Sequence, residues 1–220
     1  MRNVKACIFD LDGVIVDTAK YHYLAWRRLA EMLGFEFTEK DNERLKGVSR
    51  VRSLEILLEV GNIDATPEQK EKWAHDKNEW YVDYITKMGA DEILPGVVPF
   101  LVELRQKGIK TAIGSASKNA NLILSRLGLM SHFDAIIDGN KVSAAKPDPE
   151  VFVAAANVLG VSPEHSVVFE DAEAGIEAAK AGGMFAVGVG SDQILAKADV
   201  VIGSLADLNY EKFMCLLNVK

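Results

Sequence analysis

The stretch FDLDGVIVDT, residues 9–18, places two acids, Asp10 and Asp12, directly after an apolar run. The run from Val4 to Phe9 predicts a short buried β-strand. Acids that follow such a strand lie at its carboxyl edge, where open parallel sheets bind their ligands. Because two like charges this close either raise each other's pKa or need a cation, the pair indicates Mg²⁺ held by oxygen ligands. Taken alone, the motif also fits a strand end followed by an Asx turn.

The composition is that of an ordinary globular protein that can bury a full hydrophobic core. The chain has 220 residues, of which 49% are hydrophobic, and a formal net charge of −7. The acidic balance argues against nucleic acid or an acidic membrane as the main partner, because both attract basic surfaces. Cys7 and Cys215 show no metal-binding spacing, and we predict that both are buried and reduced. The sequence carries no pattern typical of a signal peptide or a membrane span, so we expect a cytoplasmic protein.

The rest of the chain alternates between apolar runs and helical stretches. Five further runs have β-strand character: residues 110–114, 134–138, 166–170, 185–189 and 199–202. Helices are predicted over 97–108, with Gly108 as C-cap, and over 149–160, which ends at Gly160. Strands that are apolar throughout and alternate with helices predict a parallel sheet covered on both faces. We therefore predict an α/β fold with a doubly wound, Rossmann-like core.

The segment from residue 17 to residue 88 differs, because it shows helical periodicity without a convincing strand. One predicted helical face is formed by Tyr21, Leu24, Ala25, Leu29, Met32 and Leu33. A second helix begins at Pro67, and the aromatic side chains expected in the core of the segment are Trp73, Trp80 and Tyr84. We predict an α/β core formed by residues 1–16 and 89–220, and an inserted all-helical cap domain, residues 17–88, that opens and closes over the acids.

Three further motifs follow predicted strands. IGSASKN, residues 113–119, passes from a strand into a helix through small polar residues whose N–H groups and hydroxyl can hold a phosphate. Lys146 stands in the stiff loop AAKPDPEVF at 144–152, and Glu170 with Asp171 follows an apolar run. Each motif has a simpler interpretation when taken alone: a helix N-cap, a solvated lysine, and acids that favour a helix start.

Together and in this order, the four motifs resemble those of the haloacid dehalogenase superfamily of phosphotransferases, over essentially the full length of the chain. The resemblance implies that Asp10 attacks phosphorus to form an aspartyl-phosphate and that Asp12 acts as general acid and base. It implies that Ser115 and Lys146 stabilise the transferring phosphoryl group. Mg²⁺ is then expected on Asp10, the backbone carbonyl of Asp12, Glu170 and Asp171. The presence of Asp12 disfavours dehalogenation.

The predicted cap adds cationic side chains to these motifs. LKGVSRVRS, residues 45–53, carries Lys46, Arg50 and Arg52 on a glycine-containing loop, and arginine suits bidentate phosphate contacts. A solvated helix start is the simpler interpretation of this stretch. His22 and Trp26 lie four residues apart on one predicted helix and could face the same cleft, although packing is the commoner role of such side chains.

With AKYHYLAW, KGVSR, HDKNE and SASKN, the chain is similar to the β-phosphoglucomutases within that superfamily. This resemblance implies interconversion of β-glucose 1-phosphate and glucose 6-phosphate, with Mg²⁺ as cofactor and glucose 1,6-bisphosphate as intermediate. It implies that Arg50 binds the distal phosphate and that His22 and Lys77 couple cap closure to proton transfer at Asp12. The other residues that it implies in ligand contact are Trp26, Lys46, Gly47, Val48, Ser49, Ala116, Ser117, Lys118 and Asn119.

Two other functions fit the same motifs. Water as the acceptor in place of a sugar hydroxyl gives a sugar-phosphate phosphatase, and a non-catalytic protein that binds Mg²⁺ or phosphate is the third alternative. Ala172 stands where many members of the superfamily have a hydroxyl residue, so we expect altered metal affinity. His75, His132 and His165 are expected to be surface or packing residues. The expected partner is a sugar phosphate, with no nucleic acid or membrane, and the expected state is a monomer.

Overall fold

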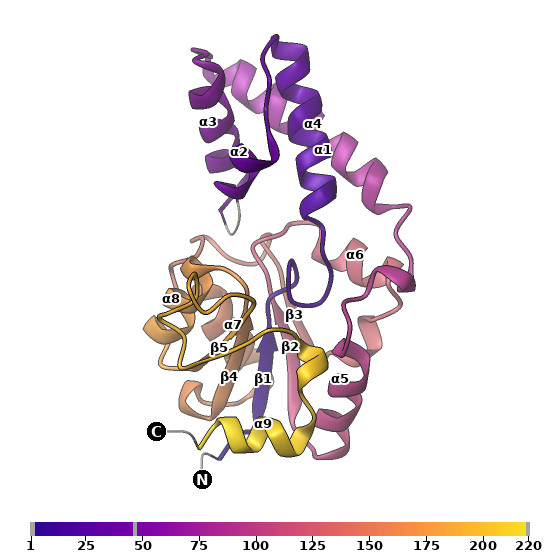
Figure 1. Ribbon diagram of the computed structural model, residues 1–220, viewed down its shortest axis with the longest axis vertical. Helices are drawn as coiled ribbons and strands as arrows, with labels where there is room; N and C mark the ends of the chain where they lie inside the picture. Colours follow the sequence, from indigo (N-terminus) through magenta and orange to yellow (C-terminus); the bar gives the residue numbers. More distant parts are fainter. Residues whose placement is uncertain (1–2, 46–47, 219–220) are drawn as a thin grey trace.

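A single parallel sheet forms the centre of the computed structural model, which describes residues 3–45 and 48–218 (Figure 1). Its strands are β1 (Ala6–Phe9), β2 (Lys110–Gly114), β3 (Ala135–Ile137), β4 (Ser166–Glu170), β5 (Phe185–Val189) and β6 (Val200–Ile202). They lie in the order β3-β2-β1-β4-β5-β6, and every neighbouring pair is parallel. From β1 to β3, successive strands are added on one side of β1, and from β4 to β6 they are added on its other side. Doubly wound sheets bind their ligands where this order changes sides, beside β1. The predicted Rossmann-like core is confirmed.

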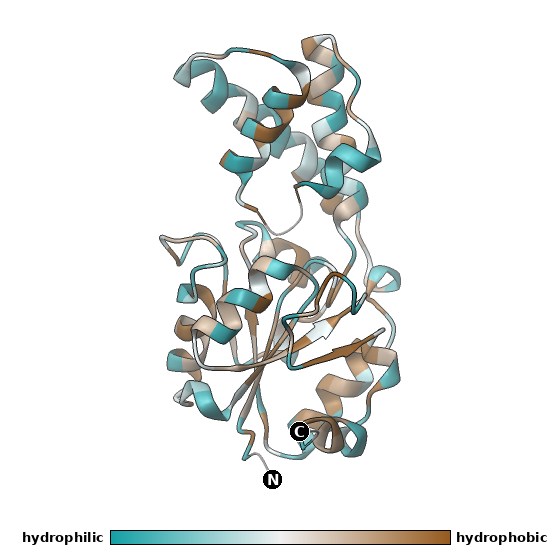
Figure 2. Ribbon diagram, turned by 60° about the vertical axis from the view of Figure 1, so that its left-hand side comes forward, coloured by the Kyte–Doolittle hydropathy of each residue, from teal (hydrophilic) through white to brown (hydrophobic). Residues whose placement is uncertain are grey.

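Helices cover both faces of this sheet because successive side chains of a strand point to opposite faces. Cys7 and Phe9 of β1 pack in one hydrophobic cluster, and Ala6 and Ile8 pack in another. The first cluster takes most of its helical side chains from α5 (Val97–Gln106), α6 (Ala120–Arg126) and α9 (Tyr210–Leu216), and Ala25, Tyr81 and Ile85 from the helices between β1 and α5 also belong to it. The second takes them from α7 (Glu150–Leu159) and α8 (Glu173–Ala181). Figure 2 shows hydrophobic residues concentrated in the strands between these helices.

Short helical turns complete the connections of the α/β part. The 3₁₀ turns are η1 (Ala90–Glu92), η2 (Met130–His132), η3 (Pro163–His165) and η4 (Leu205–Asp207). The predicted helix over 149–160 is confirmed, with Gly160 as its left-handed C-cap at φ 66°. The helix predicted over 97–108 ends earlier, since Lys107 is the C-cap of α5 and Gly108 follows at φ 71°.

In the part of the chain that the structure describes, four helices lie beyond the carboxyl ends of the strands, at the top of Figure 1. They are α1 (Ala19–Leu33), α2 (Glu39–Glu43), α3 (Arg50–Gly61) and α4 (Pro67–Ile85). These helices enclose a hydrophobic cluster of their own, built around Trp26, Leu29 and Leu57. Pro67 opens α4 as predicted, and the Thr66 side chain caps it by accepting from Gln69 N.

Two neighbouring chain segments connect these helices to the sheet. Val16 forms an antiparallel bridge with Ile93, and Leu94 N donates to the Ile15 carbonyl over 3.0 Å. Glu92 accepts from the Tyr21 hydroxyl and pairs with Lys20 Nζ at 2.6 Å. The outgoing and returning segments are therefore joined to each other both before α1 and at its first turn.

Three packing predictions are wrong. Leu24 and Met32 are 45% and 57% exposed, because the buried face of α1 combines Ala25 and Leu29, as predicted, with Trp26 and Ala30. Cys215 is exposed, although Cys7 is buried as predicted. Trp73, Trp80 and Tyr84 are only half-buried and pack at the edges of the clusters. No helix among the described residues combines the length and apolar character that a membrane crossing needs.

Candidate functional site

The adjacent carboxyl ends of β1 and β4 bring three acids together. The two strands pair in register, so Asp10 follows β1 at the level where Glu170 ends β4. One carboxylate oxygen from each of Asp10, Glu170 and Asp171 lies within 4.8 Å of the other two. Asp10 is 6% exposed and Glu170 is 1% exposed. The structure thus gathers three of the expected metal ligands at one point of the sheet edge.

Lys146 reaches these acids from the loop before α7. Its Nζ lies 2.5 Å from Asp10 Oδ1 and 2.8 Å from Glu170 Oε2, and its side chain is buried. Burial lowers the pKa of a lysine, but the two carboxylates outweigh burial and raise the pKa of Lys146 above its ordinary value. Lys146 therefore stays charged, and its interpretation as a solvated side chain is wrong.

The acids carry more negative charge than one lysine neutralises. Burial raises the pKa of Glu170 to about 7, with Lys146 opposing the shift and Asp10 adding to it. Burial, then the charges of Glu170 and Asp10, raise the pKa of Asp171 to about 9. Closely spaced carboxylate oxygens with an excess of negative charge suit a hard divalent cation. The donor set therefore fits Mg²⁺.

Asp12 is bound by Thr18, the residue before α1. The Thr18 hydroxyl donates to Asp12 Oδ1, and the Thr18 side chain makes no capping bond to the helix. Burial, followed by the charge of Asp10, raises the pKa of Asp12 to about 7. A carboxyl group with this pKa exists in both protonation states near neutral pH, as a general acid and base must.

Ser115 follows β2, the strand on the other side of β1, and is 1% exposed. Its Oγ accepts from Ser117 N over 3.0 Å, and Ser117 Oγ accepts from Asn119 N over 3.3 Å. The N-cap of α6 is Asn119, which makes no side-chain capping bond. The interpretation of Ser115 as an ordinary N-cap is therefore wrong, because its hydroxyl shapes the loop ahead of the helix.

A turn after β3 supports this loop and was not predicted from the sequence. Asn140 Nδ2 donates to the Lys118 carbonyl over 2.9 Å. A Cβ at Gly139 would lie 2.3 Å from the Ala116 carbonyl oxygen, so glycine permits a close approach there. Asp138 is 3% exposed and accepts from Asn140 N over 3.0 Å. The Asp-Gly-Asn sequence at the end of a predicted strand was the available signal.

A hydrogen bond joins this loop to α4. Asn119 Nδ2 donates to Asn78 Oδ1 over 3.1 Å, and Asn78 belongs to α4. Asn78 was not among the predicted residues, although it directly follows Lys77. The segment after β2 therefore contacts α4 in the arrangement seen here.

His22 of α1 and Lys77 of α4 are in direct contact. Lys77 Nζ lies 2.9 Å from His22 Nδ1, and the His22 ring stacks on Tyr81 with 4.1 Å between centroids. Burial, then the charge of Arg50, lowers the pKa of Lys77 well below its ordinary value. Burial, then Lys77 and Arg50, lowers the pKa of His22 in the same way. Tyr81 was missed, although its spacing of four residues from Lys77 places both on one helical face.

Trp26 lies in the hydrophobic core of α1–α4 and is 1% exposed. Lys77 Nζ is 4.4 Å from its ring centroid. The prediction that Trp26 faces a cleft is wrong, since the ring is covered. Packing against Lys77, the simpler alternative, describes it better.

Residues 49–53, the last part of the predicted basic stretch, form the start of α3. Ser49 is the N-cap of α3 and accepts from Arg52 N over 3.3 Å. Arg52 pairs with Glu55 and Glu59, each at 3.0 Å, so the simpler interpretation holds for this arginine. Arg50 is half-buried, and Val48 packs against the hydrophobic core of the helices. The predicted residues Lys46 and Gly47 lie outside the described residues.

The remaining predicted positions have simple surroundings. His75 is exposed, and His132 and His165 are half-buried, as expected of surface or packing residues. Ala172 lacks a hydroxyl, but its backbone N–H donates to Glu170 Oε1 over 3.0 Å.

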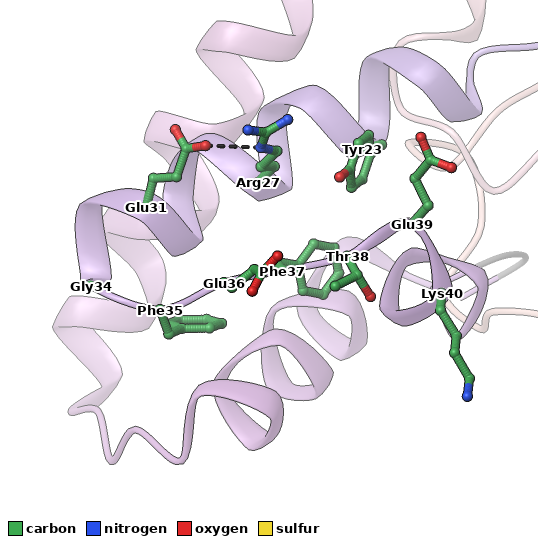
Figure 3. Close-up of a pocket in the computed structure, with 10 residues that line it drawn as sticks. All are labelled: Tyr23, Arg27, Glu31, Gly34, Phe35, Glu36, Phe37, Thr38, Glu39 and Lys40. Atoms are coloured by element: carbon green, nitrogen blue, oxygen red, sulfur yellow. Dashed lines mark hydrogen bonds and ion pairs between the residues drawn. The ribbon is translucent and has the colours of Figure 1, made fainter.

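A hollow of about 720 Å³ lies between α1 and the start of α2, lined by residues such as Tyr23, Arg27 and Phe37 (Figure 3). It contains none of the candidate site residues and is not the candidate active site.

Comparison with known proteins agrees with this geometry. A family model for haloacid dehalogenase-like hydrolases matches residues 4–183. The chain belongs to the haloacid dehalogenase-like hydrolase family. Among curated members, it is 46% identical over 210 residues to β-phosphoglucomutase of Bacillus subtilis, covering 94% of this chain and 93% of the relative.

Further relatives include a phosphatase and a β-phosphoglucomutase of known structure. The chain is 36% identical to the phosphorylated carbohydrates phosphatase of Thermotoga maritima, with 82% of each protein covered. Its structure matches the crystal structure of β-phosphoglucomutase from Clostridium difficile with a TM-score of 0.93 at 43% identity, covering 98% of this chain and 97% of that one. The resemblance to the haloacid dehalogenase superfamily is therefore confirmed.

Proposed function

We propose that this protein is a β-phosphoglucomutase, which interconverts β-glucose 1-phosphate and glucose 6-phosphate through glucose 1,6-bisphosphate. The observation that carries the proposal is the presence of two separate cationic sets. Lys146 lies at Asp10, whereas Arg50 lies on α3, one of the helices beyond the sheet edge. A bisphosphate needs two such sets, one for each phosphate.

Asp10 is the proposed nucleophile. Its carboxylate attacks phosphorus, the P–O bond to the sugar breaks, and an aspartyl-phosphate forms. Lys146 and Ser115 stabilise the charge on the transferring phosphoryl oxygens. Asp12 protonates the departing sugar oxygen and later removes the proton from the attacking sugar hydroxyl. Its pKa of about 7 suits both roles.

Asp10, Glu170 and Asp171 are the proposed ligands of Mg²⁺, with the backbone carbonyl of Asp12 as a further ligand. When bound, the cation neutralises the negative charge of the phosphate and of the carboxylates. The excess of acid over Lys146 in this cluster supports the proposal.

Residues 17–88 are the proposed cap domain. Cap closure would bring Arg50, with Ser49 and Val48, to the distal phosphate. The loop after β2 would contact the ligand from the side of the sheet, through Ser117, Lys118 and Asn119. The contact between His22 and Lys77 would then transmit closure to Asp12. The Thr18 hydroxyl, which binds Asp12 at the first turn of α1, supports a link between the position of that helix and the acid.

The experiment follows products by ³¹P NMR after mixing the protein with Mg²⁺, β-glucose 1-phosphate and a trace of the bisphosphate. The proposal predicts glucose 6-phosphate as the main product. Inorganic phosphate as the main product supports the second candidate, a sugar-phosphate phosphatase, which the likeness to the Thermotoga maritima enzyme favours. Turnover of the α-anomer in preference to the β-anomer contradicts the proposed specificity.

A further inference from the structure

A glycine in α8 stands where the carboxylate of Glu170 needs room. Gly175 is buried in the first turn of the helix. A Cβ built on it would lie 2.0 Å from Glu170 Cδ and 2.1 Å from Glu170 Oε2. These separations are far below van der Waals contact. A side chain at position 175 and the observed carboxylate position therefore exclude each other.

Glu170 cannot move away without losing a hydrogen bond. Its Oε1 accepts from the Ala172 N–H over 3.0 Å, and its Oε2 accepts from Lys146 Nζ over 2.8 Å. The residue is 1% exposed, so solvent does not replace a lost partner. The position of this carboxylate is thus fixed from three sides, by the helix start, by the lysine and by the surface of Gly175.

The backbone does not by itself explain this glycine. Gly175 is helical and does not belong to the glycines with positive φ, such as Gly13. Glycine is a poor helix former, and alanine would suit the helix better. The space taken by the Glu170 carboxylate gives the physical reason for a residue without a side chain.

We propose that Gly175 is a positioning residue for the metal site, acting through Glu170. The missing side chain lets the Glu170 carboxylate lie against α8 and present its oxygen beside Asp10 and Asp171. The inference rests on the proposed Mg²⁺ site but not on the mutase reaction, because Mg²⁺ binding is measurable without any sugar phosphate.

The first test is Gly175→Ala, with Mg²⁺ binding measured by titration calorimetry and by the rise in Tm on adding Mg²⁺. Loss of support for a metal ligand weakens metal affinity by about 10- to 100-fold, and that loss is expected here. The matched control is Gly182→Ala at the end of the same helix, where the nearest atoms to a Cβ lie at 3.3 Å. The control should bind Mg²⁺ as the wild type does.

The second test restores the space by shortening the acid. Glu170→Asp removes one methylene, so the double variant Glu170→Asp/Gly175→Ala has room for the new methyl group. We expect it to bind Mg²⁺ more tightly than the product of the two single losses predicts. Losses that simply multiply contradict the proposal, and so does wild-type affinity in Gly175→Ala.

Folding is checked by circular dichroism in both variants. If Gly175→Ala does not fold, the proposal requires the double variant to fold, and failure of both overturns it. A wild-type protein that binds no Mg²⁺ overturns the metal site and this inference together. A wild-type protein that binds Mg²⁺ but releases only inorganic phosphate overturns the mutase function alone.

Discussion

Lys77 Nζ lies 2.9 Å from His22 Nδ1, and the two residues come from different helices, α4 and α1. Lys77 is 2% exposed, and two aromatic rings, those of Trp26 and Tyr81, face its Nζ. A lysine in such surroundings loses hydration that these partners only partly replace. The charged form of Lys77 is therefore destabilised in the folded protein, and the pKa of Lys77 is lowered.

The lowered pKa of Lys77 predicts a specific pH dependence of stability. Between that pKa and the ordinary lysine value of about 10.4, the unfolded chain binds more protons than the folded one, so stability rises with pH. Lys77→Met removes this contribution. The difference in unfolding free energy between variant and wild type should shrink as pH rises from 7.5 to 9.5, by at most about 1.4 kcal/mol per pH unit.

Urea unfolding at several pH values measures this difference. His22 and Asp12 face Lys77, but their pKa shifts act mainly below this pH range, and Arg50 keeps its charge throughout. Asp171 titrates in the range equally in both proteins. If the difference in unfolding free energy between Lys77→Met and the wild type does not vary with pH, the charged form of Lys77 is not destabilised by the fold.

Lys146→Met should strongly destabilise the metal-free protein. The substitution leaves Asp10 and Glu170 buried without their cation, and breaking a buried ion pair costs about 3–5 kcal/mol. Turnover should fall by at least about 10²-fold, since a charge that stabilises the transition state is lost.

Unfolding in EDTA and in Mg²⁺ checks the Lys146 prediction, and Mg²⁺ should recover part of the lost stability. Lys180→Met is the control, because Lys180 forms a surface pair with Asp199 at 2.6 Å and is 44% exposed. Its loss should cost about 0–1 kcal/mol. Equal effects of the two substitutions would be incompatible with the buried site described here.

Arg50→Lys should separate the two phosphate-binding roles. Lysine cannot make the bidentate contact of a guanidinium, so mutase kcat/KM should fall by about 10- to 100-fold. Hydrolysis of a small aryl phosphate, which has no second phosphate, should be nearly unchanged. Arg52→Lys is the matched control, because Arg52 is engaged with Glu55 and Glu59. A similar loss in both assays would place Arg50 outside the distal site.

Tyr81→Phe should raise stability. The Tyr81 hydroxyl is buried, and no hydrogen bond of standard geometry joins it to residues 3–45 or 48–218, although Thr18 lies close enough to lower its pKa against the effect of burial. A buried unpaired polar atom costs about 1–3 kcal/mol, so its removal should increase the unfolding free energy by about 1 kcal/mol. Tyr84→Phe, on the same helix at a half-buried position, should change little. Destabilisation of Tyr81→Phe would mean that the hydroxyl is paired in solution.

The sequence predicted the sheet well and the helices above it less well. Residues 110–114, 166–170 and 185–189 are strands with the predicted bounds, because a strand buried on both faces is a continuous apolar run between polar ends. On α1, Leu24 was assigned to the buried face and Trp26 to a cleft, and both assignments are wrong. An amphipathic helix with several apolar positions does not reveal which of them face its neighbours.

In the site, too, some residues were predictable from the sequence and others were not. Asp10 and Glu170 were predictable because acids that end adjacent parallel strands must meet at one edge. Tyr81 and Asn78 were not, since their contacts with His22 and Asn119 join segments distant in the chain. The turn at Asp138 had a local signal, because Asp138 accepts from Asn140 N only two residues away. The sequence shows Gly175 only as a glycine in a predicted helix. Its role could be inferred only once the position of the Glu170 carboxylate was known.

The most direct measurement of the central claim traps the phospho-enzyme. Glucose 1,6-bisphosphate and Mg²⁺ are added, and the acyl phosphate is reduced with borohydride, which converts a phosphorylated aspartate to homoserine. Peptide mass spectrometry then locates the changed residue. The account predicts homoserine at position 10 and none in Asp10→Asn. Reduction at another acid, or an unmodified Asp10 in a protein that turns over substrate, would contradict it.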